Sequence, residues 1–125
     1  MKGIELIFLA VGAVIGACIR YRITESSMVL GGLSINVLIV NVIGSFILGI
    51  FSVVSPFLNL DTSYALFMSV GFCGSLTSMS SFAHETCNLL DNGSFHLAVL
   101  NIIANLFLSL GALVAGRTLS TIILH

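Results

Sequence analysis

The sequence predicts an all-α membrane protein with four transmembrane helices in each chain. Of its 125 residues, 58% are hydrophobic and only 7% are charged, whereas a soluble domain is about 45–50% apolar and about 25% charged. The apolar residues also fall into four runs, each long enough for the roughly 20 residues that a spanning helix needs. Lipid is therefore the expected solvent for most of the surface.

The four runs are separated by short segments with turn chemistry. We expect spans at residues 4–22, 33–57, 64–90 and 97–124, which together make a single membrane domain over residues 1–125. The segment 24–32, the segment 55–61 and the tripeptide Asp91-Asn92-Gly93 contain the turn-forming residues between them. This organisation predicts a multi-pass protein of the cell membrane.

The first run has an alternative interpretation as a lipoprotein signal peptide. Lys2 and the apolar stretch that ends at Cys18 imitate such a peptide. Gly12 and Gly16, however, form a GxxxG pair of the kind that lets membrane helices pack closely. Because three further spans follow, we interpret the run as a packed helix.

The three cysteines lie in apolar runs and form no CxxC pair. We expect Cys18, Cys73 and Cys87 to be small buried side chains and not metal ligands or disulfides.

Basic residues are few and evenly divided between the two sides of the membrane. Four spans place Lys2 and Arg117 on one side. Arg20 and Arg22 fall on the other side. Orientation normally follows an excess of Lys and Arg on the cytoplasmic side, so we expect insertion in both orientations and an antiparallel, dual-topology dimer. The alternative is that differences finer than this count set the topology. With net charge −1 the chain has no basic face for nucleic acid.

Polar residues within the second and fourth spans recur at helical spacing. Each span places three amides or hydroxyls on one face: Asn41, Ser45 and Ser52, and Asn101, Asn105 and Ser109. Such side chains face the bundle interior or a water-filled path, although hydrogen bonding between helices, worth about 0.6–2 kcal/mol per pair, is the structural alternative. Uncharged donors without a mid-span ionisable group favour a path for a small anion over a proton-coupled pump.

The third span contains a stretch that favours a broken helix. Residues 71–82, GFCGSLTSMSSF, combine two glycines with four serines and a threonine. Irregular backbone at membrane depth persists only where it is buried in protein or lines a cavity, so we expect a break near mid-membrane, although hydroxyl-rich helices also remain continuous. If the helix resumes after Gly74, then Ser75, Met79 and Phe82 share one face.

Three motifs resemble those of the CrcB/Fluc family of fluoride channels. They are GAVIGACIRY at residues 12–21, NVIGSFILG at residues 41–49 and GFCGSLTSMSSFAHE at residues 71–85, and the resemblance covers the whole chain. It implies a passive, fluoride-selective channel that exports cytoplasmic fluoride. It also implies an antiparallel dimer with two pores and one structural, untransported sodium ion on the two-fold axis.

The resemblance further implies roles for individual residues. Backbone carbonyls hold sodium in the family, and Gly74 and Thr77 match those positions. The other matches are, for the fluoride pathway, Asn41, Ser78, Met79, Ser81, Phe82 and Glu85, and for the vestibule or for packing, Arg20, Gly44 and Gly49.

Two substitutions depart from the family pattern near the proposed pore. Ser78 replaces the second of two consecutive threonines and keeps the hydroxyl, whereas Met79 replaces a phenylalanine. Ala13 replaces a glycine of the first motif. Because some members function as unlike pairs, the partner of this chain is either a second copy or an unlike CrcB-type subunit.

Parts of the sequence are also compatible with two other functions. A small dual-topology multidrug-type proton-coupled transporter also has four spans, but it needs a mid-span acidic residue, whereas Glu5 lies at the start of a span and Trp is absent. Ser80 and His84 lie at i and i+4, as a nucleophile and a base could. Since Ser80 is one hydroxyl among several and His84 lies near the membrane surface, an enzyme is not expected.

Overall fold

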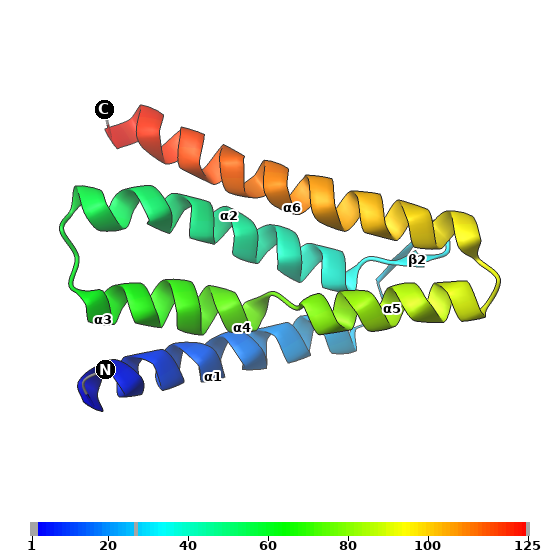
Figure 1. The fold of residues 1–125 in the computed structure, drawn as a ribbon, viewed down its shortest axis with the longest axis horizontal. Coiled ribbons are helices and arrows are strands. Elements are labelled where there is room, and N and C mark those ends of the chain that lie inside the picture. Colours follow the sequence, from blue (N-terminus) through cyan, green and yellow to red (C-terminus); the bar gives the residue numbers. More distant parts are fainter. Residues whose placement is uncertain (1–2, 27, 125) are drawn as a thin grey trace.

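Four helical segments run back and forth in the computed structural model, which describes residues 3–26 and 28–124 (Figure 1). The first, second and fourth segments are single helices, namely α1 (Gly3–Glu25), α2 (Asn36–Phe57) and α6 (Phe95–Leu124). The third comprises α3 (Thr62–Ala65), η1 (Leu66–Cys73), α4 (Gly74–Leu76) and α5 (Met79–Asp91). All four segments are long and apolar enough to span a membrane, which confirms the predicted all-α, four-span fold.

The third segment changes its hydrogen bonding along its length. In η1 the helix is of the π type, in which each amide bonds the carbonyl five residues earlier. At its end the Gly74 amide bonds the carbonyl of Ser69. Such wide turns are frequent at functional sites, and this one ends directly before the glycine of the predicted break.

A short hairpin that the sequence analysis did not predict joins α1 to α2. Strand β1 (Val29–Leu30) pairs antiparallel with β2 (Leu33–Ser34). Gly31 and Gly32 between them have φ values of +62° and +85°, which is the left-handed geometry of tight hairpin turns and strongly favours glycine. The second helix therefore begins at Asn36 and not at residue 33.

Asn36 closes this connection with one buried side chain. The Asn36 Nδ2 group donates to the carbonyl of Ile23, at 2.7 Å, and to that of Ser26. Its Oδ1 atom accepts from the amide of Met28 at 3.1 Å. The end of α1 is thus tied to the start of α2.

The other two turns also have local chemical causes. Asp61 caps α3 by accepting the amide of Ser63 at 3.1 Å. After α5, Gly93 adopts φ +76°. The Ser94 amide then bonds the Leu89 carbonyl at 2.8 Å, and the Gly93 amide bonds the carbonyl of Leu90 at 3.1 Å. This pair of bonds is a Schellman helix end.

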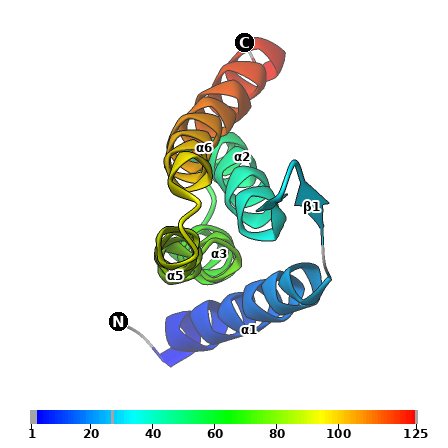
Figure 2. The same cartoon turned by 90° about the vertical axis from the view of Figure 1, so that its right-hand side faces the viewer.

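The third segment lies between α1 and the pair formed by α2 and α6 (Figure 2). Glycines bring the elements close together. A Cβ atom on Gly12 or Gly16 would collide with the carbonyls of Phe67 or Phe72 in η1, which confirms the predicted packing role of this GxxxG pair.

The contact between α2 and α6 is reciprocal. A Cβ on Gly49 of α2 would collide with the Leu113 carbonyl of α6, and a Cβ on Gly116 of α6 would collide with the Phe46 carbonyl of α2. Each helix therefore presents a glycine to the backbone of the other, and the two axes approach more closely than larger residues would permit.

The cysteine prediction was correct for one residue of three. All are free thiols, but only Cys73 is buried, whereas Cys18 and Cys87 are exposed on the outside of the chain. An apolar run in a membrane helix includes the outward face as well as the inward one, because both contact apolar surroundings. The hydrophobicity of the flanking sequence therefore could not distinguish the buried cysteine from the two exposed ones.

The glycine contact between α2 and α6 predicts a stability difference between two substitutions. Gly49→Ala should lower the free energy of unfolding by about 1–3 kcal/mol, the usual cost of overpacking. Gly111→Ala on α6 should raise it by up to about 1 kcal/mol through the higher helix propensity of alanine, because a Cβ there meets no described atom within 4 Å. Unfolding of the two purified variants in detergent measures both effects, and equal stabilities would contradict the packing assignment.

Candidate functional site

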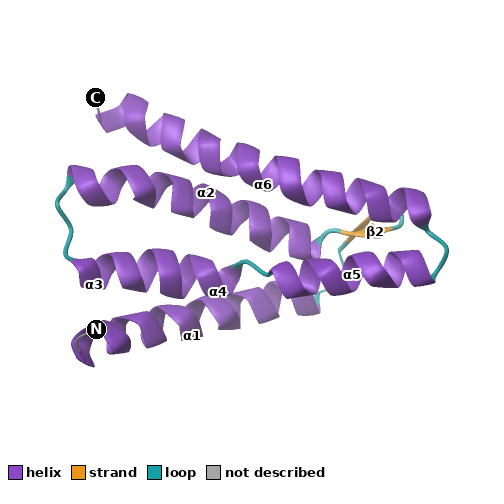
Figure 3. Ribbon diagram, in the orientation of Figure 1, coloured by secondary structure: helices purple, strands orange, loops and turns teal. Residues whose placement is uncertain are grey.

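The third segment is interrupted by two extended residues. Thr77 has φ −84° and ψ 155°, and Ser78 has φ −148° and ψ 111°. The helix therefore ends at Leu76 and begins again at Met79, and the connection appears as a loop between α4 and α5 in Figure 3.

The interruption changes the predicted register of the residues around it. Ser75 belongs to α4, which ends at Leu76, whereas Met79 and Phe82 belong to α5, so no continuous helix puts the three residues on one face. Met79 and Phe82 remain at i and i+3 within α5. Two extended residues break the helical periodicity on which that argument depended.

Hydroxyl groups satisfy backbone groups on both sides of the interruption. The Thr77 hydroxyl donates to the Cys73 carbonyl at 3.0 Å, and the Thr77 amide bonds the same carbonyl at 3.1 Å. The Ser78 hydroxyl accepts the Ser81 amide at 3.0 Å, as is typical of a helix N-cap. The hydroxyl-rich sequence thus supplies partners that a continuous helix would not need.

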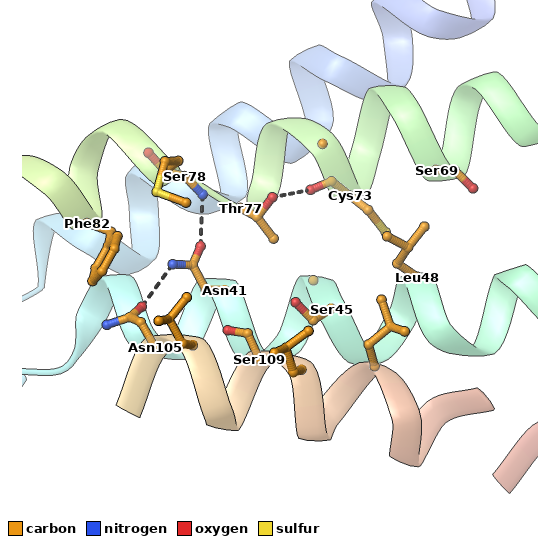
Figure 4. Close-up of a pocket in the computed structure, with 16 residues that line it drawn as sticks. Asn41, Ser45, Leu48, Ser69, Cys73, Thr77, Ser78, Phe82, Asn105 and Ser109 are labelled. Carbon is orange, nitrogen blue, oxygen red and sulfur yellow. Dashed lines mark hydrogen bonds between the residues drawn. The ribbon is translucent and has the colours of Figure 1, made fainter. Parts of the chain in front are cut away.

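Asn41 of α2 completes the interruption from the neighbouring helix. Its Oδ1 atom accepts the Ser78 amide at 2.8 Å, and its Nδ2 group donates to Asn105 Oδ1 of α6 at 3.0 Å (Figure 4). One amide side chain therefore connects the break in the third segment to both α2 and α6.

The network continues through α6 back to α5. Asn105 Nδ2 donates to Asn101, both to its carbonyl and to its side-chain oxygen, each at 3.0 Å. Asn101 Nδ2 donates to Thr86 Oγ1 at 3.0 Å, and that hydroxyl donates to the Phe82 carbonyl at 2.8 Å. Asn101 and Asn105 are only 0% and 4% exposed, so these bonds satisfy groups that are costly to bury alone.

A cavity of about 350 Å³ lies beside this network, between α2, α6 and the third segment (Figure 4). None of the described residues that line it is acidic, basic or a histidine. The lining residues are Asn41, Gly44, Ser45, Leu48, Ser69, Cys73, Gly74, Thr77, Ser78, Met79, Phe82, Asn105, Leu106, Ser109, Leu110 and Leu113. The Ser109 hydroxyl oxygen is buried and has no hydrogen-bond partner among the described residues.

This cavity brings together most of the residues that the sequence analysis proposed for the ion pathway and the cation. Gly44 also lines it, and a Cβ there would collide with the Thr77 methyl group. Ser45 and Ser109 of the two polar faces line it as well, but Ser52 does not. The Ser52 side chain donates to the Gly49 carbonyl of its own helix at 2.7 Å.

Ser81 and Glu85 lie apart from the cavity, in a second hollow of about 640 Å³. It is lined by Ser34, Val37, Ser80, Ser81, His84, Glu85 and Asn88. The Glu85 Oε1 atom is buried without a hydrogen-bond partner among the described residues. The Ser80 hydroxyl lies 3.3 Å from that of Ser78, a pairing that gives no support to a Ser80–His84 couple.

Arg20 lines neither cavity. Its Nε group donates to the Ser75 carbonyl at 2.8 Å, across the contact between α1 and the third segment. The guanidinium therefore binds one of the last carbonyls before the interruption.

Several members of the network were not singled out from the sequence. Thr86 was missed, and Asn101 and Asn105 were noted as a polar face without a role at the break. Spacing in the sequence could have indicated these contacts. Residues four apart lie one helical turn from each other, as do Phe82 and Thr86, and Asn101 and Asn105.

Comparison with known proteins places the chain in one family. Residues 7–117 match the family model described as CrcB-like protein, Camphor Resistance (CrcB). A protein of Nitrosopumilus maritimus (strain SCM1) named fluoride-specific ion channel FluC is 55% identical over 124 residues, which are 98% of each chain. A protein of the same name from Methanocaldococcus jannaschii is 43% identical over 116 residues, covering 93% of this chain and 94% of the relative. The chain therefore belongs to the CrcB family.

Proposed function

We propose that this chain forms a passive, fluoride-selective channel that exports fluoride from the cytoplasm. The observation that carries the proposal is the uncharged cavity at the interrupted helix. Its polar groups are amides and hydroxyls, and its aromatic residue is Phe82. The relatives named as fluoride-specific ion channels support the choice of ion.

The cavity chemistry suits a small anion that must enter and leave. Asn41 Nδ2 has two N–H groups, of which one is donated to Asn105, and the second is available to an anion. The Ser109 hydroxyl supplies another donor, and an aromatic edge such as that of Phe82 carries partial positive charge. Because no ammonium or guanidinium of the described residues lines the cavity, the cavity offers an anion no full positive charge from them.

A passive channel is sufficient for export. Hydrogen fluoride crosses lipid uncharged and releases fluoride in a less acidic cytoplasm. A negative membrane potential then drives the anion outward, with about 2.3 kcal/mol per charge for each 100 mV.

The cavity favours this function over proton-coupled drug transport, since such a transporter needs an ionisable group where the substrate binds. Glu85, the acidic residue nearest the interruption in sequence, lines the second hollow.

We also propose a structural sodium ion held by the backbone carbonyls of Gly74 and Thr77. In a continuous helix, the Gly74 carbonyl would accept the Ser78 amide and the Thr77 carbonyl would accept the Ser81 amide. Asn41 and the Ser78 hydroxyl take those amides instead, which releases both carbonyls. Hard cations prefer such oxygen ligands, so the residues fit the ion.

Two carbonyls are too few to enclose a sodium ion, so the proposal includes a second subunit. An antiparallel pair related by a two-fold axis would double the number of carbonyls. The partner is a second copy of this chain or an unlike CrcB-type subunit, and the even division of basic residues supports dual topology.

Asn41→Asp tests the anion path. The aspartate retains an oxygen for the Ser78 amide but loses the donors and adds negative charge. Two like charges 4 Å apart repel by about 4 kcal/mol at the effective dielectric of a protein surface, so fluoride efflux should fall more than about hundredfold. Fluoride efflux from liposomes that contain only the purified chain measures this. Ser52→Ala is the matched control on the same helix and should leave efflux unchanged, and wild-type efflux in Asn41→Asp would contradict the path.

Phe82 and Met79 test the contribution of the aromatic edge. Phe82→Ile should abolish fluoride efflux while the assembly seen by size-exclusion chromatography persists, because only the ring edge is lost. Met79→Phe should preserve or increase efflux, because it restores an aromatic residue at the mouth of the same cavity. Normal efflux through Phe82→Ile would exclude the ring as a contact for the ion.

Dual topology predicts that a C-terminal tag is reached from both sides of the membrane in comparable amounts. Two additional lysines beside Lys2 should bias insertion and lower activity unless an oppositely biased partner is supplied. Accessibility labelling in cells that express only this chain measures the distribution. A single orientation would contradict the antiparallel homodimer and leave the unlike pair.

A further inference from the structure

We infer that Arg20 is a positioning residue for the cation site and sets the affinity of that site. The inference rests on the proposed function, because it concerns the sodium ion assigned there to Gly74 and Thr77. Its structural basis is the hydrogen bond from Arg20 Nε to the Ser75 carbonyl. Ser75 lies between Gly74 and Thr77 in the chain.

The interruption leaves several carbonyls of the ending helix without their usual amides. The last carbonyls of any helix lack an intrahelical partner, and here the extended Thr77 and Ser78 remove the following turn. Within residues 3–26 and 28–124, Ser75 is the one among these whose carbonyl receives a bond from a side chain of another helix. Arg20 therefore occupies the Ser75 carbonyl, and the carbonyls of Gly74 and Thr77 remain for the cation.

The path of α1 places the guanidinium at this point. Gly16 lies one helical turn before Arg20, and a Cβ there would collide with the Phe72 carbonyl and approach the Leu76 amide to 3.1 Å. This close approach brings the backbone of α1 directly against α4. A side chain one turn later then reaches the end of α4.

The interruption is consequently held from two sides. Arg20 of α1 binds the carbonyl end of the first half-helix, and Asn41 of α2 binds the amide end of the second, through Ser78. A guanidinium at a helix C-terminus is also favoured by the helix dipole. Without it, the Ser75 carbonyl would be unpaired in a part-buried site, and α4 would be free to turn that carbonyl toward the ion or toward another amide.

The Arg20 bond and the Arg20 charge act in opposite directions on a cation. The bond orders the carbonyls and strengthens binding, whereas the positive charge weakens it. Glutamine separates the two effects, because its Nε2 atom is the same number of bonds from Cα as Arg Nε. Arg20→Gln therefore keeps a donor in place without the charge, Arg20→Met has similar volume without a donor, and Arg20→Lys keeps the charge but moves the donor one atom further out.

The experiment is thermal unfolding of the purified chain in detergent, titrated with sodium against an N-methylglucamine background after exhaustive exchange. Binding to the folded state raises the melting temperature as sodium rises, so each titration gives a half-saturating concentration. For Arg20→Met this concentration should rise about tenfold, because sodium binding would then have to order carbonyls that Arg20 holds in place beforehand. Arg20→Gln should stay at or below the wild-type value, and Arg20→Lys should rise severalfold. Arg22→Met is the matched control, since Arg22 is 81% exposed in its side chain and pairs with Glu25, and it should match the wild type.

Three other outcomes would contradict either the role of Arg20 or the cation site itself. If Arg20→Met melts lower at every sodium concentration with an unchanged half-saturation, Arg20 only stabilises the fold and the inference is wrong. If Arg20→Lys matches the wild type while Arg20→Gln binds sodium more weakly, the charge and not the Nε donor sets the affinity, and the inference is wrong. This comparison holds even if Arg20→Met does not assemble. A wild-type chain whose melting temperature ignores sodium would overturn the cation proposal itself.

Discussion

The hydrogen bond from the Ser78 amide to Asn41 Oδ1 is the interaction on which the rest of the site depends. In lipid, a backbone amide without a partner is very unfavourable, and an interrupted membrane helix therefore requires replacement partners. Asn41 supplies that partner to the amide of Ser78, the residue directly before the new helix. Its other end binds Asn105, which binds Asn101, which binds Thr86. The interruption, the α2–α6 pair and the start of α5 are thus parts of one hydrogen-bonded unit.

The fold could be predicted from the sequence because hydrophobicity is a strong and additive signal in membrane segments. The four spans and the packing role of Gly12 and Gly16 followed from run length and from glycine spacing. The hairpin between α1 and α2 was missed, although Gly31-Gly32 is a turn signal, because two-residue strands leave no alternating pattern. Asn36 was missed for a similar reason: a single amide beside an apolar run does not indicate which carbonyls of the preceding helix it will bind.

The site was less accessible to sequence reasoning than the fold. Helical spacing placed Asn41 and Ser45 toward a common cavity, but it also placed Ser52 there, because a periodic face says nothing of where along the helix the neighbouring elements diverge. The face proposed for Ser75, Met79 and Phe82 failed at the two extended residues. Hydroxyls and glycines indicate that a helix can be interrupted, but the exact residues depend on a partner 37 positions away, Asn41, whose role is set only by packing.

The bonds of Asn36 have a consequence for the order in which the chain is assembled during synthesis. They join residues 23–36, a separation so short that the turn can close as soon as α2 begins to emerge, since closing a short loop costs little entropy. The lateral packing of α1 must wait, because its glycines fit the third segment and not α2. The nascent protein therefore passes through a stage in which two helices share a finished turn but have no tight contact along their length. The close glycine contacts of α1 can form only once the third segment has followed it into place.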